Sequence, residues 1–112
     1  MAILENLEAL RAGLPGAETA AYMDLRSGTV LGKSAAVEQP QERFDALCAL
    51  AIDVLGGPTG ETDEAVYMKA TEATVVCRSA GASTEALCLV CAPDADVAAV
   101  LGGARRALEE AG

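Results

Sequence analysis

The sequence predicts an α/β sandwich of the α+β type, in which one five-stranded antiparallel sheet is covered by helices. Three segments repeat apolar residues every three or four positions, which is typical of amphipathic helices. Five shorter apolar runs are typical of strands, and short turns join strand directly to strand, as antiparallel pairing requires. The predicted order is α-β-β-α-β-β-β-α. A chain of 112 residues fits one domain spanning residues 1–112.

The first helix is predicted over Ala2–Leu14 and ends at Pro15 and Gly16. Its apolar residues are spaced by four, three and four, and they are Ile3, Leu7, Leu10 and Leu14. Residues 18–25 then change to a period of two, which predicts a strand whose alternate residues 20, 22 and 24 form a wetter face. Gly28 favours a tight turn, and the strand returns over Thr29–Ala35.

The second helix is predicted from Pro40 to Leu55, because Pro is tolerated in the first turn of a helix. Its apolar positions cover a wide arc of the helix surface. They are Phe44, Leu47, Cys48, Ala51, Ile52 and Leu55. Glycines and a proline at 56–60 end the helix, and residues 61–64 are predicted to form a solvated acidic connection.

Three strands are predicted over Ala65–Ala70, Thr74–Ser79 and Glu85–Cys91. A third helix follows Pro93, and Asp94 is the expected capping residue. Two adjacent glycines, 102 and 103, lie inside that helix, where each costs about 1 kcal/mol relative to Ala. These glycines could mark the close approach of another element or a bend in the helix. The alternative is that they have no structural role and are tolerated.

Composition excludes several classes of function. The chain contains no His, which removes the commonest general base and metal ligand and every Ser-His or Cys-His pair. Its formal charge is -9, so nucleic acid and anionic membrane surfaces would repel it. Residues 1–11 lack the pattern of a signal peptide, and the uncharged stretch from Ala46 ends at Asp53, too short for membrane insertion. We therefore expect a cytoplasmic protein without catalytic residues.

Two motifs resemble cofactor or metal sites but fit them poorly. Cys88 and Cys91 have C-x-x-C spacing, yet they lie in a predicted strand, where positions three apart face opposite sides. Only Cys48 and Cys77 remain as further thiolate ligands, so we expect no metal and reduced cysteines that pack as small apolar side chains. The glycine-rich segment 56–62 has Glu61 where a phosphate-binding loop has Lys, so no cofactor is expected.

One surface feature predicts a partner. The wide apolar arc of the second helix lies beside a run, Val66-Tyr67-Met68, that is expected at the edge of the sheet. An exposed apolar strand edge is an aggregation hazard unless it is paired or covered. A homodimer would pair these edges and pack the second helices together. The alternative is a monomer that buries the helix on its own sheet.

The whole pattern resembles the roadblock-type dynein light chain domain, of the bacterial kind and within the longin/profilin-like superfamily. The resemblance covers about residues 4–108. It is carried by residues 4–14 and by the segments ETAAYMDLRSGTVLGKSA, QERFDALCALAIDVL and EAVYMKATEATVVCRSAGASTEALCLVCAPDADVAAVLGGARRAL. Asp24 and Gly28 match an acidic residue and a glycine near the hairpin turn of many members. The chain also has a full helix after its last strand, as bacterial forms do.

This resemblance implies a dimer formed through the second helix and the third strand, making one continuous sheet. The corresponding interface positions are Phe44, Cys48, Ala51, Ile52, Leu55, Val66, Tyr67 and Met68. It also implies a non-enzymatic adaptor or regulator that binds a small Ras-like GTPase. The alternative is a domain of related architecture that senses a small molecule in a large apolar pocket, and a hydrolase using carboxylates alone is a remote third.

Overall fold

The computed structural model describes residues 3–111 and confirms the predicted fold class and order of elements. Ala2, where the first helix was predicted to begin, lies outside the described residues. In chain order the elements are the 3-10 helix η1 (Ile3–Asn6), α1 (Leu7–Gly13), β1 (Ala17–Asp24), β2 (Thr29–Ala35), α2 (Gln41–Leu55), β3 (Glu64–Met68), β4 (Ala73–Arg78), β5 (Glu85–Cys91) and α3 (Val97–Ala111).

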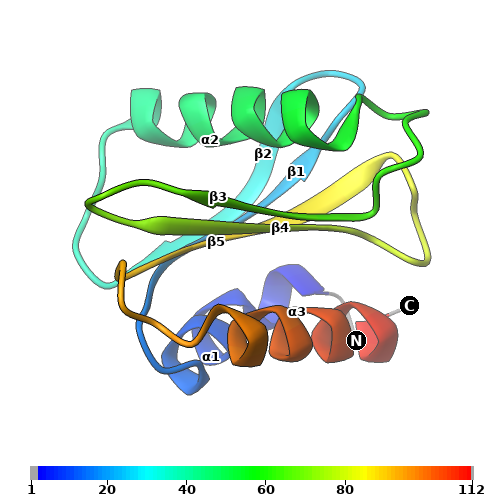
Figure 1. The fold of residues 1–112 in the computed structure, drawn as a ribbon. Coiled ribbons are helices and arrows are strands. Elements are labelled where there is room, and N and C mark those ends of the chain that lie inside the picture. The colour runs from blue at the N-terminus through cyan, green and yellow to red at the C-terminus, as the bar shows by residue number, and fades with distance from the viewer. Residues whose placement is uncertain (1–2, 112) are drawn as a thin grey trace.

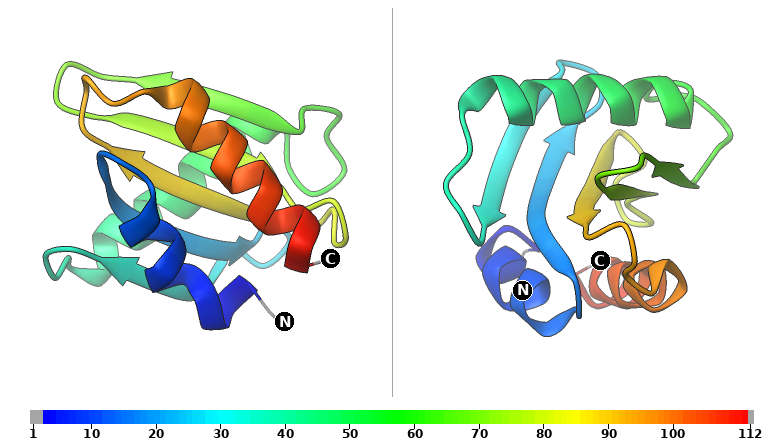
Figure 2. Two further views of the ribbon diagram at one scale, coloured as in Figure 1. Left: turned by 90° about the horizontal axis from the view of Figure 1, so that it is seen from below. Right: turned by 60° about the vertical axis from the view of Figure 1, so that its left-hand side comes forward.

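The strands form one antiparallel sheet in the order β2-β1-β5-β4-β3, so β2 and β3 are its two edges. Helix α2 covers one face of the sheet, and α1 and α3 cover the other (Figure 1). Figure 2 shows the same three layers from two further directions. The described chain begins and ends in the layer of α1 and α3, opposite α2 (Figure 1).

Each face of the sheet has its own apolar core, because both faces are covered by helices. Ala21, Met23 and Leu25 pack beneath α2, whereas Ala20 and Tyr22 pack against the layer of α1 and α3. The expectation of a wetter face on this strand is therefore wrong: Ala20 is 0% exposed and Tyr22 5%. The alternation of side chains along this strand did not show that helices from both ends of the chain cover its second face.

The ends of the two long helices are set by local backbone chemistry. Helix α2 ends at Leu55 and is capped by Gly56, whose φ of 79° is a left-handed conformation that favours glycine. Helix α3 begins at Val97, and the Asp96 Oδ1 accepts a hydrogen bond from the Ala99 N–H at 3.1 Å. The prediction that Asp94 caps this helix is wrong by two residues, because the segment after Pro93 forms a turn before the helix starts.

The two glycines inside α3 have different surroundings. A Cβ added at Gly103 would lie 2.5 Å from Cδ2 of Leu14, whereas one added at Gly102 would meet only Nη1 of Arg106, at 3.9 Å. Gly103 therefore marks a close approach between α3 and the segment after α1. In the described part of the chain, none of the helices has the length and apolar character needed to cross a membrane.

Candidate interaction surface

In the described part of the chain, β3 is an edge strand, and no strand lies beside its outer backbone groups. The Arg78 N–H donates to the Asp63 carbonyl at 2.7 Å, and the Lys69 N–H donates to the Glu72 carbonyl at 2.8 Å. In an antiparallel ladder such hydrogen-bonded positions alternate with positions that point the other way. Residues 63, 65, 67 and 69 thus direct their N–H and C=O groups toward β4, and residues 64, 66 and 68 direct theirs outward.

Three neighbouring apolar side chains are exposed along this edge. Val66 is 40% exposed, Tyr67 42% and Met68 56%. Val66 lies opposite Val75 and so faces α3, whereas Tyr67 lies opposite Thr74 and faces α2. The edge therefore presents apolar side chains on both sides of the strand, a feature of protein interaction sites.

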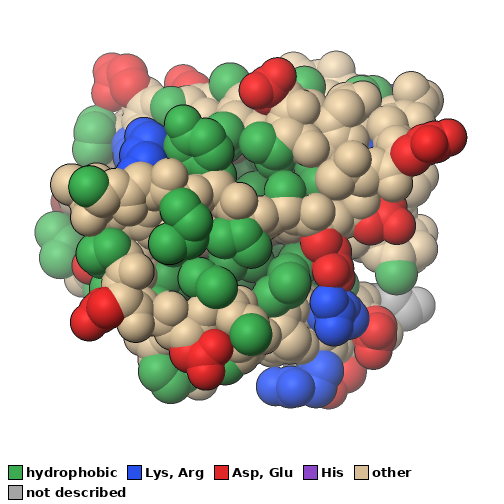
Figure 3. Space-filling model, in the orientation of Figure 1, with side chains coloured by type: hydrophobic (Ala, Val, Ile, Leu, Met, Phe, Trp, Pro, Cys, Tyr) green, Lys and Arg blue, Asp and Glu red, His purple; other side chains and the backbone are tan. Residues whose placement is uncertain are grey.

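A shallow groove of about 150 Å³ continues this surface onto α2. It is lined by Arg43, Ala46, Leu47 and Leu50 of α2, by Tyr67 and Thr74 of the sheet, and by Lys69 and Glu72 of the β3–β4 turn. An ion pair between Arg43 and Glu72 ties the helix to the turn between β3 and β4. Figure 3 shows hydrophobic side chains gathered across this face, over β3 and the adjoining sides of α2 and α3. We call the β3 edge with Ala46 and Leu50 the β3 patch.

The structure separates the positions that the resemblance assigned to an interface. Phe44, Cys48, Ala51 and Leu55 are at most 2% exposed, because they form the core between α2 and the chain's own sheet. They are not an exposed surface of this chain. Ile52 lies on the other side of α2, toward the β1–β2 turn, where its Cδ1 is the atom nearest to a Cβ added at Gly28. Val66, Tyr67 and Met68 are the members of the set that lie at the free edge.

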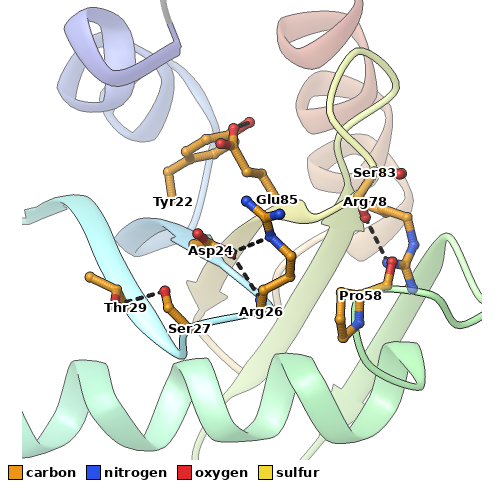
Figure 4. Close-up of polar contacts among 9 residues, drawn as sticks. All are labelled: Tyr22, Asp24, Arg26, Ser27, Thr29, Pro58, Arg78, Ser83 and Glu85. Atoms are coloured by element: carbon orange, nitrogen blue, oxygen red, sulfur yellow. Dashed lines mark hydrogen bonds and ion pairs between the residues drawn. The ribbon is translucent and has the colours of Figure 1, made fainter.

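A buried arginine holds together the elements that border the patch. The Arg78 guanidinium donates to the carbonyl oxygens of Leu55, at 2.8 Å, and Thr62, at 3.0 Å. It also donates to the carbonyls of Pro58 at 3.2 Å and Ser83 at 2.8 Å (Figure 4). The end of α2, the 56–63 connector and the β4–β5 turn are therefore fixed to one side chain. No pattern in the sequence indicated this role.

One carboxylate of the acidic connection is paired, whereas residues 61–63 are exposed as predicted. The Arg105 Nε and Nη2 donate to the two carboxylate oxygens of Glu64, both at 2.7 Å. These hydrogen bonds from Arg105 lower the pKa of Glu64 below its ordinary value. The pair links the start of β3 to α3, so both helices beside the patch are tied to the sheet.

The cysteines offer no reactive thiol. Cys88 lies in the core beneath α2 and Cys91 in the opposite core, which confirms that this C-x-x-C pair faces two sides of a strand. Burial raises the pKa of Cys77 and Cys88 to about 12 and that of Cys91 to about 11. Such thiols stay protonated at neutral pH and are poor nucleophiles and metal ligands. Within residues 3–111, His, Cys, Asp and Glu side chains form no group of three that could hold a metal ion.

A hollow of about 300 Å³ opens to the surface between β4 and α3. Seven of its ten lining residues are charged or polar: Asp63, Glu64, Arg78, Ser79, Ser83, Arg105 and Glu109. This recess differs from the large apolar pocket that small-molecule sensing would require. The geometry thus offers a surface for protein contact more readily than a site for chemistry.

Known structures with the same architecture were found by comparing folds. A Roadblock/LC7 domain from Streptomyces avermitilis superposes with a TM-score of 0.78, covering 98% of this chain and 94% of that one at 15% identity. The chain has the roadblock fold. The gliding protein MglB of Thermus thermophilus (TM-score 0.70, 22% identity, 97% and 84% covered) has it as well. So does MglC of Myxococcus xanthus (TM-score 0.72, 16% identity, 99% and 97% covered).

Comparison of the sequence with protein-family models gave no match. Comparison with curated proteins also gave none. The likeness of this chain to known proteins therefore lies in the arrangement of its helices and strands, at identities of 22% or less among the three structures above.

Proposed function

We propose that this chain is a non-enzymatic adaptor or regulator that forms a homodimer and binds a small Ras-like GTPase in the cytoplasm. Residues 1–112 would act as one roadblock-type domain, without a cofactor. The observation that carries the proposal is the β3 patch: an open strand edge with Val66, Tyr67 and Met68 exposed beside a groove on α2.

The dimer is supported by the outward-directed backbone groups of β3, which have no strand to pair with in the described chain. Within residues 3–111, no strand lies beside the outward-directed N–H and C=O groups of residues 64, 66 and 68. A second copy placed edge to edge would satisfy these groups and cover the apolar side chains on both sides of β3. The interface we propose includes Ala46 and Leu50 of α2 in place of the four residues buried beneath that helix.

The GTPase partner is supported by the resemblance of the sequence to bacterial roadblock domains and by the fold shared with MglB and MglC. The absence of His from the sequence and the protonated, buried thiols favour binding over catalysis.

The dimer is tested by Val66→Pro. The Val66 N–H points away from β4, so proline there removes no hydrogen bond within the chain but blocks pairing at the free edge. Lys33→Pro is the matched control, because Lys33 holds the equivalent outward position on the opposite edge strand β2. Light scattering coupled to size exclusion should give a dimer for the wild type and Lys33→Pro and a monomer for Val66→Pro. A monomeric wild type at tens of micromolar would refute the homodimer.

The GTPase partner is tested by affinity capture from native cytosol on the immobilised protein, with a non-hydrolysable GTP analogue or GDP added. The expected result is a Ras-like GTPase, identified by mass spectrometry, whose retention depends on which nucleotide is present. Binding should then be reproduced with the purified GTPase. Equal recovery with both nucleotides, or recovery of no GTPase, would argue against this partner. The roadblock chain alone should release no phosphate from GTP.

A further inference from the structure

In one alignment, the β3 edges of two copies of the chain complement each other. This inference rests on the proposed homodimer. Two copies related by a two-fold axis pair their β3 strands antiparallel. The outward groups at residues 64, 66 and 68 must then meet outward groups of the other copy. Only one such alignment pairs all of Glu64–Met68 with itself: the one that places Val66 on the axis, opposite Val66 of the second copy.

This alignment places Glu64 opposite Met68, and it matches two further pairs by size and by charge. Tyr67 of one copy lies opposite Ala65 of the other, so a large side chain meets a small one on the α2 side. Beyond the strand ends, Lys69 lies opposite Asp63. Both positions direct their backbone groups away from the new pair, and at such non-hydrogen-bonded pairs the Cα atoms are closest, about 4.5 Å apart.

Both charged groups are exposed. The Asp63 side chain is 78% exposed and forms an ion pair with the buried Arg78 guanidinium, with 3.5 Å between Oδ1 and Nε. The Lys69 Nζ lies 5.8 Å from the centre of the Tyr67 ring, on the same side of the strand. Two-fold symmetry forms this Asp63–Lys69 contact twice in each dimer.

We propose that the Asp63–Lys69 contact between copies sets the register of the β3 pairing and makes the edge select a second copy of this chain. Shifting the axis to Ala65 or Tyr67 shortens the paired segment to three residues and moves Lys69 opposite Glu61 or Ala65. The strand of another protein forms these two charge contacts only if an acidic residue precedes it and a basic residue follows it, as Asp63 and Lys69 do here. The partner that this edge fits is thus another copy, aligned on Val66.

Charge reversal tests the contact. Lys69→Glu and Asp63→Lys each place like charges opposite one another twice, so each variant alone should dimerise about tenfold more weakly in sedimentation analysis. Mixing the two variants creates two opposite-charge contacts in the heterodimer and should restore an affinity within about threefold of wild type. Arg26→Glu and Glu38→Lys, singly and mixed, are the matched controls, because both residues are exposed and lie outside the β3 patch. They should leave dimerisation unchanged.

Cysteine scanning tests the register independently. A disulfide requires Cα atoms within about 7 Å, and only the residue on the two-fold axis lies that close to its own copy. Val66→Cys should therefore cross-link under mild oxidation, whereas Ala65→Cys and Tyr67→Cys should not. The four native cysteines are at most 2% exposed and stay shielded.

The outcomes separate the two proposals. A monomeric wild type refutes the homodimer and this register with it. A dimeric wild type whose affinity does not change in the charge variants, or whose mixture is no tighter than the single variants, overturns the Asp63–Lys69 contact but leaves the dimer. Cross-linking at position 65 or 67 instead of 66 overturns the register alone.

Discussion

The guanidinium of Arg78, at the end of β4, lies 2.8 Å from the carbonyl oxygen of Leu55, the last residue of α2. The same buried side chain donates to carbonyls in the 56–63 connector and in the β4–β5 turn. One side chain therefore satisfies backbone acceptors from three parts of the chain that lie far apart in the sequence.

We expect Arg78→Met to lower the free energy of unfolding by about 3 kcal/mol, because it leaves several buried carbonyls without donors. Urea denaturation followed by circular dichroism measures this change. Arg106→Met is the control, since Arg106 is exposed and its loss should change stability by less than about 0.5 kcal/mol. Equal stability of the two variants would show that the Arg78 hydrogen bonds contribute nothing to folding.

Two alanines of α2 should respond in opposite ways to a charge. Ala51 is 0% exposed beneath the helix, so Ala51→Glu buries an unpaired carboxylate and should destabilise the fold by several kcal/mol. Ala46 is exposed and lines the groove beside β3, so Ala46→Glu should leave the monomer folded but weaken the proposed dimer. Circular dichroism during urea unfolding checks the first change, and light scattering the second. A stably folded Ala51→Glu protein would contradict this placement of α2.

The adjacent glycines of α3 should also differ. Gly102→Ala removes a helix-breaking residue where there is space, so it should raise the free energy of unfolding by about 1 kcal/mol. Gly103→Ala gains the same helix propensity but drives a methyl group against Leu14, and should therefore be less stable than Gly102→Ala by about 1 kcal/mol or more. Thermal melts of both variants decide this, and equal melting temperatures would contradict the close approach.

Stability should fall at alkaline pH. Burial raises the pKa of Tyr22, Cys77 and Cys88 to about 12 in the folded chain. The same groups ionise at about 10 and about 8.5 when unfolded. Because the folded state holds these protons more tightly, its stability is complete below about pH 8.5 and declines as pH rises toward 12.

Urea titrations at pH 7, 9 and 10.5 check this sign, and constant stability across the series would contradict it. A thiol reagent at pH 8 gives a second measurement. It should label the four cysteines slowly in the native protein and quickly in urea, because all four are buried.

The strand and helix pattern was predictable because local periodicity and turn residues determine it. Thr29–Ala35 and Glu85–Cys91 were predicted with the bounds that the structure has, and the other strands differ by one or two residues at their ends. The exposure of Val66, Tyr67 and Met68 also agrees with the expected place of this run at the edge of the sheet.

Other features depend on contacts that no local pattern encodes. Periodicity identifies the buried side of α2 but not which flank lies next to β3, so Ile52 was grouped with the edge although it lies toward the β1–β2 turn. Arg78 was missed because its partners are main-chain carbonyls, which every residue carries. The wide apolar arc of α2 is explained by the chain's own sheet, which buries Phe44 and Leu55.

Both ends of the described chain lie in the layer of α1 and α3, on the side of the sheet away from α2 (Figure 1). An affinity handle or fluorescent reporter fused at either end would therefore project away from the α2 side of the molecule. A bait immobilised through such a handle keeps α2 open to solution.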